Sequence, residues 1–155
     1  MPYEFSMRRR MEFSDTDMAG IVHFANLFRF MEDTEHAFIR SLGFRVHAEQ
    51  QGRMNGMVRV HAECDYHQPL RYQDELEIRL LVERRGRRSL RYRFLFFKTE
   101  DRGVPLTTPL LSARGALAVV SVNRDVGQDE IIPAELPAEL LEQIEEAPPE
   151  LWKQD

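Results

Sequence analysis

Only one cysteine, Cys64, occurs among the 155 residues, so no disulfide can form within the chain. No apolar run approaches the ~20 residues that a membrane-spanning helix requires. The amino terminus has neither a long apolar core nor the small-residue cleavage site of a secretory signal peptide. We therefore expect a cytoplasmic protein that makes no contact with a membrane.

Several motifs that mark particular chemistries are also missing. The sequence contains no Gly-rich phosphate loop and no G-x-S-x-G nucleophile elbow. The histidines form no helical pair beside an acid, and no cysteine cluster accompanies them. Neither a bound metal nor a separate cofactor is therefore expected. The formal net charge of −5 argues against nucleic acid as a partner.

Lysine is scarce, and arginine supplies nearly all of the positive charge, since only Lys98 and Lys153 are lysines. Six arginines gather between residues 84 and 93. In an acidic protein such a cluster is suited to a local anion, such as a phosphorylated cofactor. A solvated hairpin explains the cluster equally well, so both interpretations stay open at this point.

Alternation of apolar and polar residues predicts five strands. Residues 113–122 are apolar on both parities, which is typical of a more fully covered strand. The connection Arg85-Gly86-Arg87 predicts a tight antiparallel hairpin, and a polar loop is expected over residues 100–109. The five predicted strands are 3–13, 58–66, 76–83, 88–98 and 113–122.

Residues 24–42 break this alternation, because their apolar side chains recur every three or four positions. That spacing predicts a helix of roughly five turns, which Gly43 would end. A shorter helix is expected at 136–146, followed by a loose tail after Pro148-Pro149.

The order of elements is therefore one strand, a long helix and four more strands. An α+β fold buries both apolar surfaces, with a curved antiparallel five-stranded sheet wrapped around one long central helix. We expect residues 1–125 to form a single domain, and residues 126–155 to form a C-terminal extension with a short helix and a loose tail.

The stretch SDTDMAGIVH, residues 14–23, carries the most informative chemistry. Asp15 and Asp17 stand upstream of Gly20, which permits unusual φ values, and of a helix whose first N–H groups have no partner. A carboxylate that faces such a helix end can attack a carbonyl carbon or activate water, while backbone donors stabilise the oxyanion. The same residue types are common in loops and caps, so that alternative also stays open.

Two segments carry a resemblance to a known family. The stretch FSDTDMAGIVHFANLFRFMEDTE resembles the signature of hotdog-fold acyl-CoA thioesterases of the 4-hydroxybenzoyl-CoA thioesterase type, including the YbgC-like group. The stretch CDYHQPLRYQDELEI is similar to a second element of that family, and the resemblance covers residues 5–123. It implies hydrolysis of an acyl-CoA thioester to a free acid and CoA, with coenzyme A as part of the substrate.

By this resemblance, Asp17 takes the position of the catalytic carboxylate, acting as nucleophile or general base. The Phe24 N–H takes the position of the oxyanion donor. The family's histidine stands one place later than His23, so His23 is expected either to orient water or substrate or to cap the loop. Asp15 is the weaker candidate and is expected only to hold the loop.

The resemblance also implies residues that bind the substrate. Gly20, Ile21 and Val22 match the turn that leads into the helix, and Asn26 is expected to line the pocket. The hairpin matches the region in which family members contact the CoA phosphates. Its candidate residues are Arg85, Arg87, Arg88 and Ser89.

Several alternatives accompany this interpretation. Some hotdog thioesterases use a helix glutamate, so Glu32 and Glu35 are candidates, although a buried or interface salt bridge explains them as well. Family members form dimers or tetramers, so we expect a homodimer or homotetramer in which residues 56–67 complete the partner's site. A non-catalytic CoA- or acyl-carrier-binding hotdog module is the alternative function, and a hotdog dehydratase is a third. The sequence leaves the acyl group open.

Overall fold

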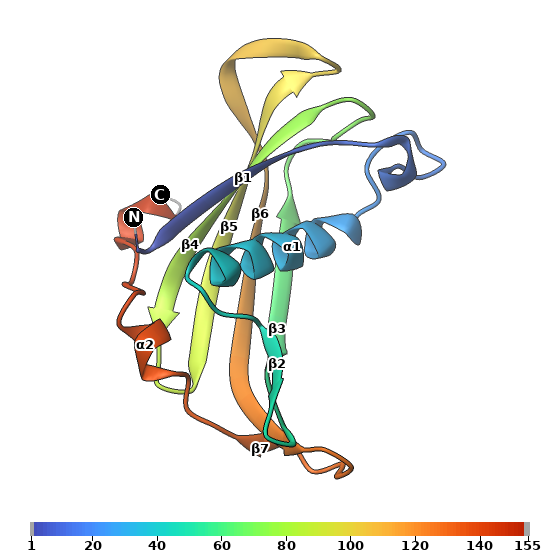
Figure 1. Cartoon of the computed structure of the whole chain (residues 1–155). Helices are drawn as coiled ribbons and strands as arrows, with labels where there is room; N and C mark the ends of the chain where they lie inside the picture. The colour runs from blue at the N-terminus through green and yellow to red at the C-terminus, as the bar shows by residue number, and fades with distance from the viewer. Residues whose placement is uncertain (1, 154–155) are drawn as a thin grey trace.

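The computed structural model describes residues 2–153 and shows one antiparallel sheet wrapped around a long helix (Figure 1). The strand order is β1-β4-β5-β6-β3-β2, with β7 paired to β6. The strands are β1 (Glu4–Arg10), β2 (His47–Gln50), β3 (Arg53–Tyr66), β4 (Glu75–Arg85), β5 (Ser89–Asp101), β6 (Val104–Asp125) and β7 (Ile132–Pro133). The helices are α1 (Asn26–Ser41) and α2 (Ala138–Leu141), with short 3-10 turns at Phe13–Asp15 and Pro149–Leu151. The predicted α+β architecture is confirmed.

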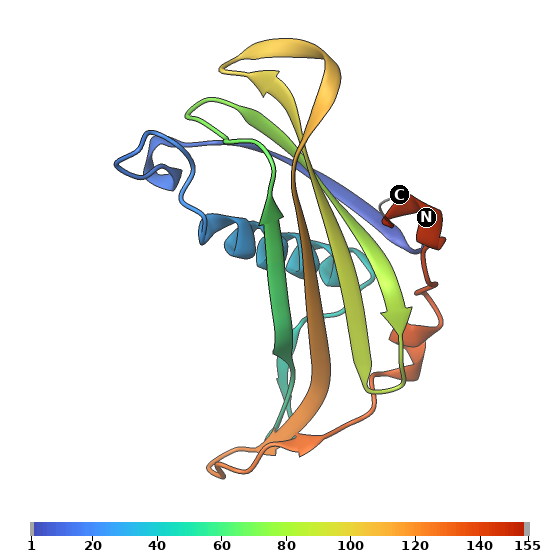
Figure 2. The same ribbon diagram turned by 180° about the vertical axis from the view of Figure 1, so that it is seen from behind.

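The helix α1 lies across the concave face of the sheet, in front of the strands in Figure 1 and behind them in Figure 2. Its buried residues follow the predicted spacing and include Leu27, Met31 and Phe38. The helix approaches β6 closely at Gly115, where an added Cβ would lie 2.4 Å from the Met31 sulfur. A residue without a side chain therefore lets the helix settle onto the middle of the sheet.

The sheet is larger than predicted, because two short strands extend it. The strand β2 pairs with the beginning of β3 through a turn at Gln51 and Gly52, which both have positive φ. The polar loop expected at 100–109 is wrong, because β5 continues to Asp101 and β6 begins at Val104. Only Arg102 and Gly103 form the turn, again with positive φ. The strand β2 is too short, and the facing ends of β5 and β6 are too polar, to show an alternation that can be recognised in sequence.

The strand β3 contains a bulge that reverses its faces. The pairing of β3 with β6 shifts between Arg59 and His61. The Arg59 guanidinium consequently reaches Glu35 on α1, while Val60 is 62% exposed. Simple alternation along residues 58–66 places Val58 and Val60 on the core face. That prediction is wrong, because one extra residue inverts the alternation.

The C-terminal extension packs against the domain, so the expected loose tail is wrong for the residues up to 153. Leu140, Ile144 and Ala147 are buried, and the Ala147 N–H donates to the Val82 carbonyl at 2.7 Å. The helix is shorter than the predicted 136–146, because the Arg85 guanidinium binds the carbonyl oxygens of Leu141 and Ile144. Residues 154 and 155 of the expected tail lie outside the described part of the chain.

Candidate active site

The loop before α1 is built around Asp15, which is buried. Its carboxylate accepts the Glu12 N–H at 2.8 Å and lies 3.4 Å from Arg9 Nη2. Its carbonyl oxygen accepts the His23 N–H at 2.9 Å and Asn26 Nδ2 at 2.8 Å. Asp15 therefore holds the loop against the helix. Asn26, which was expected to line the pocket, joins the helix to the loop instead.

Asp17 is the first residue of the tight turn that follows. Its N–H donates to the Ile21 carbonyl at 2.9 Å, and its carbonyl accepts the Gly20 N–H at 3.0 Å. Gly20 closes this turn with a φ of +80°, a conformation that residues with a side chain rarely adopt. The Asp17 Oδ1 atom accepts the Ala19 N–H at 2.8 Å, whereas Oδ2 has no hydrogen-bond donor among residues 2–153. One carboxylate oxygen is therefore fixed and the other is free to act.

One backbone donor at the start of α1 is likewise free. The His23 N–H donates to Asp15, the Ala25 N–H to His23 Nδ1, and the Asn26 N–H to the His23 carbonyl. The Phe24 N–H alone among these four has no acceptor within the described residues. Because it also lies at the positive end of the helix dipole, it is suited to bind a developing negative charge.

Asp17 and Phe24 border the same cleft, which has a volume of about 380 Å³. Ile21, Val22 and Phe24 form one wall together with Asp17, and Leu27 and Ala113 form the floor. The opposite wall comes from the end of β3 and the connector after it, at Tyr66, Gln68, Pro69 and Leu70. The arrangement places one carboxylate in a mostly apolar cleft, which suits an acyl chain or ring beside a reacting carbonyl carbon.

Residue pattern alone does not identify this second wall. The stretch CDYHQPL belongs to the second segment that resembles the family, and it supplies Tyr66, Gln68 and Leu70 to the cleft. The Val22 N–H donates to the Leu70 carbonyl at 2.7 Å, and the Tyr66 hydroxyl donates to the Phe24 carbonyl at 2.8 Å. These bonds join the two walls. The signal available in the sequence was the pair Pro69-Leu70 between two strands, which indicates a fixed connector with an apolar side chain.

The connector is held in turn by a buried charge pair. The fully buried Asp74 carboxylate accepts the N–H groups of Arg71 at 2.7 Å and Arg102 at 2.8 Å, and lies 3.3 Å from Lys98 Nζ. Lys98 lies at the same distance from Asp101. Asp74 thereby ties the cleft wall to the turn between β5 and β6.

His23 does not line the cleft. Its Nδ1 accepts the Ala25 N–H at 3.1 Å, and its ring stacks on the Phe24 ring at 4.7 Å between centroids. Gly20 also lies outside the cleft lining, because its part is conformational. Of the two roles expected for His23, the geometry matches the cap rather than a group that touches substrate.

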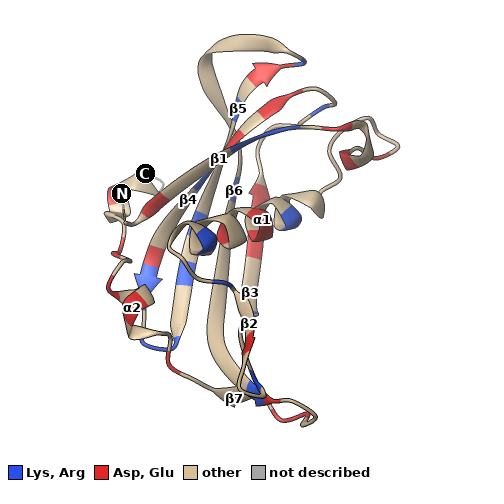
Figure 3. Ribbon diagram, in the orientation of Figure 1, with Lys and Arg blue, Asp and Glu red and all other residues tan. Residues whose placement is uncertain are grey.

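The arginine-rich hairpin between β4 and β5 lies at the other end of the sheet from the loop before α1 (Figure 3). The strand β4 runs from Glu75, beside the cleft connector, to Arg85, and its length is ~30 Å. The Arg85 guanidinium donates hydrogen bonds to carbonyl oxygens of the C-terminal extension, whereas Arg87, Arg88 and Ser89 are exposed. Within one chain, the structure therefore does not bring these four residues to Asp17.

The helix glutamates form an ion-pair cluster away from the cleft. The Arg59 guanidinium contacts Glu35 and lies 3.7 Å from Glu32. Burial raises the pKa of Glu35 to about 7, against the opposing effect of the Arg59 cation. Glu35 is fully buried and does not border the cleft, so its contacts match the salt-bridge explanation.

We expect this cluster to make stability depend on pH. Since the pKa of Glu35 is raised from 4.5 to about 7 on folding, the folded state binds the proton more tightly. The contribution of Glu35 to stability should be fully present below pH 4.5 and should fall by roughly 3 kcal/mol as the pH rises from there through 7. Urea unfolding of Glu35→Gln from pH 5 to 8 should show a flatter profile than the wild type. Glu32→Gln, at an exposed position, should keep most of the wild-type slope, because Glu32 contributes least to the shift in the pKa of Glu35. An unchanged slope in Glu35→Gln would contradict the assignment.

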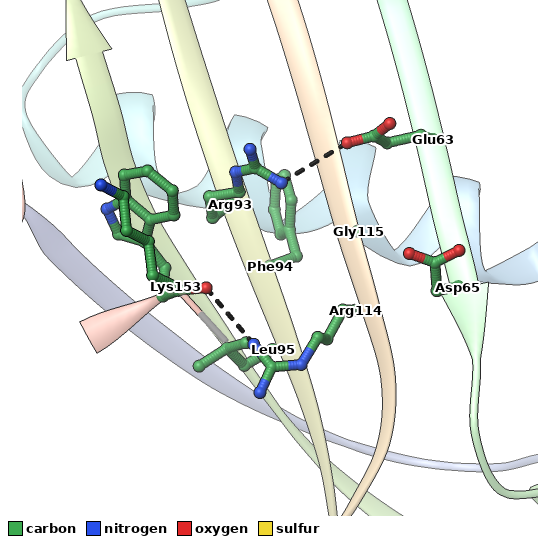
Figure 4. Close-up of a pocket in the computed structure, with 9 residues that line it drawn as sticks. Glu63, Asp65, Arg93, Phe94, Leu95, Arg114, Gly115 and Lys153 are labelled. Carbon is green, nitrogen blue, oxygen red and sulfur yellow. Dashed lines mark hydrogen bonds and ion pairs between the residues drawn. The ribbon is translucent and has the colours of Figure 1, made fainter. Parts of the chain in front are cut away.

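A second cavity, of about 270 Å³, lies on the outer face of the sheet (Figure 4). Arg93 contacts Glu63 at 3.4 Å and Glu83 at 3.0 Å, and its guanidinium lies over the Trp152 ring. Asp65 and Arg114 complete a strongly charged lining, which does not suit an acyl group.

Within residues 2–153, no cluster of three or more His, Cys, Asp or Glu side chains could hold a metal ion. The helices in the same range include none long and apolar enough to cross a membrane.

Known proteins resemble this chain in sequence and in fold. Residues 19–105 match the family described as the Thioesterase superfamily. A putative esterase from Aquifex aeolicus (strain VF5) is 35% identical over 96 residues, which are 62% of this chain and 74% of that protein. The 1,4-dihydroxy-2-naphthoyl-CoA hydrolase of Synechococcus elongatus is 35% identical over 89 residues, which are 57% of this chain and 65% of that protein. The structure of 4-hydroxybenzoyl-CoA thioesterase from Pseudomonas sp. strain CBS-3 superposes with a TM-score of 0.73 at 22% identity, over 91% of this chain and 99% of that one.

Proposed function

This chain belongs to the Thioesterase superfamily, and on that premise we propose that it hydrolyses an acyl-CoA thioester to a free acid and CoA, with Asp17 as its catalytic carboxylate. The observation that carries the proposal is the shared cleft, in which a carboxylate with one free oxygen and the free Phe24 N–H border the same volume. The hotdog fold and the resemblance drawn from residues 13–35 support it.

In this mechanism, the thioester oxygen points toward the Phe24 N–H, which stabilises the negative charge that develops on it. The Asp17 carboxylate either attacks the carbonyl carbon and forms an anhydride that water then cleaves, or removes a proton from the attacking water. In both routes the C–S bond breaks, the CoA thiolate leaves and takes a proton, and the acyl group leaves as the free acid.

We further propose that the acyl group is aromatic. The named relatives act on 4-hydroxybenzoyl-CoA and 1,4-dihydroxy-2-naphthoyl-CoA, which both carry a ring next to the thioester. In this chain, Phe24 and Tyr66 both line the cleft, together with the apolar Leu27 and Ala113. A planar ring beside aromatic side chains makes favourable stacked or edge contacts.

The test is a hydrolysis screen read by release of free thiol. Benzoyl-, 4-hydroxybenzoyl- and 1,4-dihydroxy-2-naphthoyl-CoA should be cleaved with kcat/KM at least about tenfold above that for short aliphatic acyl-CoAs. Equal cleavage of all thioesters would reject the aromatic specificity alone. Tight binding of CoA thioesters without cleavage of any of them would instead favour the non-catalytic binding module.

We also propose that the working unit is at least a homodimer, joined through the free edge of β3. The strand β2 covers only residues 53–56, so residues 57–66 have no partner on that side within the described chain. An edge of this length is a ready template for a second strand. Two copies that pair antiparallel here run in opposite directions, so the arginine-rich hairpin of one copy lies at the cleft end of the other. The hairpin would then reach CoA phosphates bound at the partner's cleft.

A heterodimer tests this arrangement. We expect Arg87→Ala/Arg88→Ala to raise KM for acyl-CoA, whereas Asp17→Asn removes turnover. If the arginines act across the interface, a heterodimer of the two variants carries one intact site and has about half the wild-type activity. If they act within their own chain, the one site that keeps Asp17 lacks its arginines, and the heterodimer has only about half the activity of the Arg87→Ala/Arg88→Ala homodimer, with the same raised KM. The homodimers of each variant are the matched controls.

A further inference from the structure

Two side chains hold the peptide group that directly follows the Phe24 N–H. This peptide consists of the Phe24 carbonyl and the Ala25 N–H. The N–H donates to His23 Nδ1 at 3.1 Å, and the carbonyl accepts the Tyr66 hydroxyl at 2.8 Å. The second bond ties the peptide to another part of the fold, because Tyr66 comes from the end of β3, far from this loop in sequence.

The other side of the Phe24 N–H is fixed as well. It belongs to the peptide between His23 and Phe24, and the His23 N–H donates to the Asp15 carbonyl at 2.9 Å. The His23 ring also stacks on the Phe24 ring, with 23° between the ring planes. Rotation at Phe24 would therefore break a bond to His23 or to Tyr66, which restricts the direction of its free N–H.

We propose that His23 and Tyr66 are positioning residues for thioester hydrolysis, which clamp the Phe24–Ala25 peptide so that the Phe24 N–H stays aimed at the thioester oxygen. This inference rests on the proposed function of the cleft and assigns two residues to it. Neither side chain exchanges a proton with the substrate. His23 acts only as a hydrogen-bond acceptor and Tyr66 only as a donor.

Preorganised donors matter because the charge on oxygen appears only in the transition state. A loosened Phe24 N–H would therefore lower kcat and leave substrate binding nearly unchanged. A general loss of structure would instead disturb the cleft walls and raise KM as well. The split between kcat and KM separates the two explanations.

The role of His23 is tested by two substitutions. Asparagine accepts a hydrogen bond from the N–H two residues later with its side-chain oxygen, but it cannot carry a proton as imidazole does. We expect His23→Ala to lower kcat about tenfold, the effect of one lost hydrogen bond, and His23→Asn to retain at least half of the wild-type kcat. If His23→Asn is as impaired as His23→Ala, or if His23→Ala has wild-type kcat, the clamp is wrong for this residue.

The role of Tyr66 is tested by removing its hydroxyl alone. Tyr66→Phe keeps the ring in the cleft, and we expect kcat to fall about tenfold with KM within about twofold of wild type. Tyr72→Phe is the matched control, since Tyr72 is 46% exposed and its hydroxyl makes no hydrogen bond within residues 2–153. The amide signals of Phe24 and Ala25 in a ¹H–¹⁵N spectrum should shift in Tyr66→Phe and not in Tyr72→Phe.

These outcomes distinguish the clamp from the proposed function. If the wild type hydrolyses acyl-CoA, Asp17→Asn does not, and Tyr66→Phe has wild-type kcat, only the clamp is overturned. If the wild type cleaves no thioester, the catalytic reading fails, and the amide shifts still report whether Tyr66 holds the Phe24 peptide. Unchanged amide signals in Tyr66→Phe would overturn the clamp in either case.

Discussion

Asp17→Asn should lower kcat for acyl-CoA hydrolysis by roughly 10²- to 10⁴-fold, with little change in KM. Asparagine has nearly the shape of aspartate, and its side-chain oxygen can still accept the Ala19 N–H that Asp17 Oδ1 accepts at 2.8 Å. The turn closed by Gly20 therefore persists. What disappears is the negative charge on the oxygen that has no donor of its own, and with it both the nucleophile and the base.

The measurement is steady-state release of free CoA, together with the affinity of the variant for uncleaved substrate. Asp15→Asn is a suitable control, because Asp15 is the other carboxylate of the same loop. Its contacts to Arg9 and to the Glu12 N–H stabilise the loop, so this variant should unfold at lower urea concentration and keep its kcat. The assignment of Asp17 fails if Asp17→Asn turns over at the wild-type rate, or if Asp15→Asn is the inactive variant.

The parts of the fold that sequence predicts are those determined by local pattern. The helix α1 and the cores of five strands each carry enough alternating or helical positions to be recognised. The bulge in β3 is not visible in this way, because one inserted residue changes which side chains face α1 without changing composition. The course of residues 142–153 depends on a bond from the Arg85 guanidinium and on the burial of Ile144 and Ala147 against the domain. The partners of these residues are distant in sequence, so local pattern does not predict their contacts.

The site follows the same division. Asp17 and Phe24 are separated by seven positions in a recognisable motif, so the sequence brings them to one place. Asn26 was assigned to the pocket because it lies in the first turn, but its partner is a carbonyl oxygen that no sequence pattern identifies. Alternation along residues 58–66 places Tyr66 on the core face, but Tyr66 is 49% exposed and its hydroxyl reaches the loop before α1. Hydrogen bonds between distant segments decide these roles.

Asp74 also bonds to residues that are distant in sequence, and Asp74→Ala should lower the free energy of unfolding by about 3–5 kcal/mol. The substitution leaves the N–H groups of Arg71 and Arg102 without their acceptor and leaves Lys98, whose side chain is 8% exposed, with Asp101 alone. A nearly buried ammonium that loses its fully buried carboxylate partner is costly because little water can replace it. Urea unfolding at neutral pH measures the loss.

The control is Asp101→Ala, which removes the more exposed partner of Lys98 and should cost no more than about 1 kcal/mol. Adding Lys98→Met to Asp74→Ala should recover part of the loss, because the uncompensated charge goes with it. Asp74→Ala with wild-type stability would show that the pair is replaceable by solvent. Because Asp74 ends the connector whose Leu70 carbonyl accepts the Val22 N–H, its loss should also raise KM. The second wall of the cleft is thus set by a buried charge that never touches the substrate.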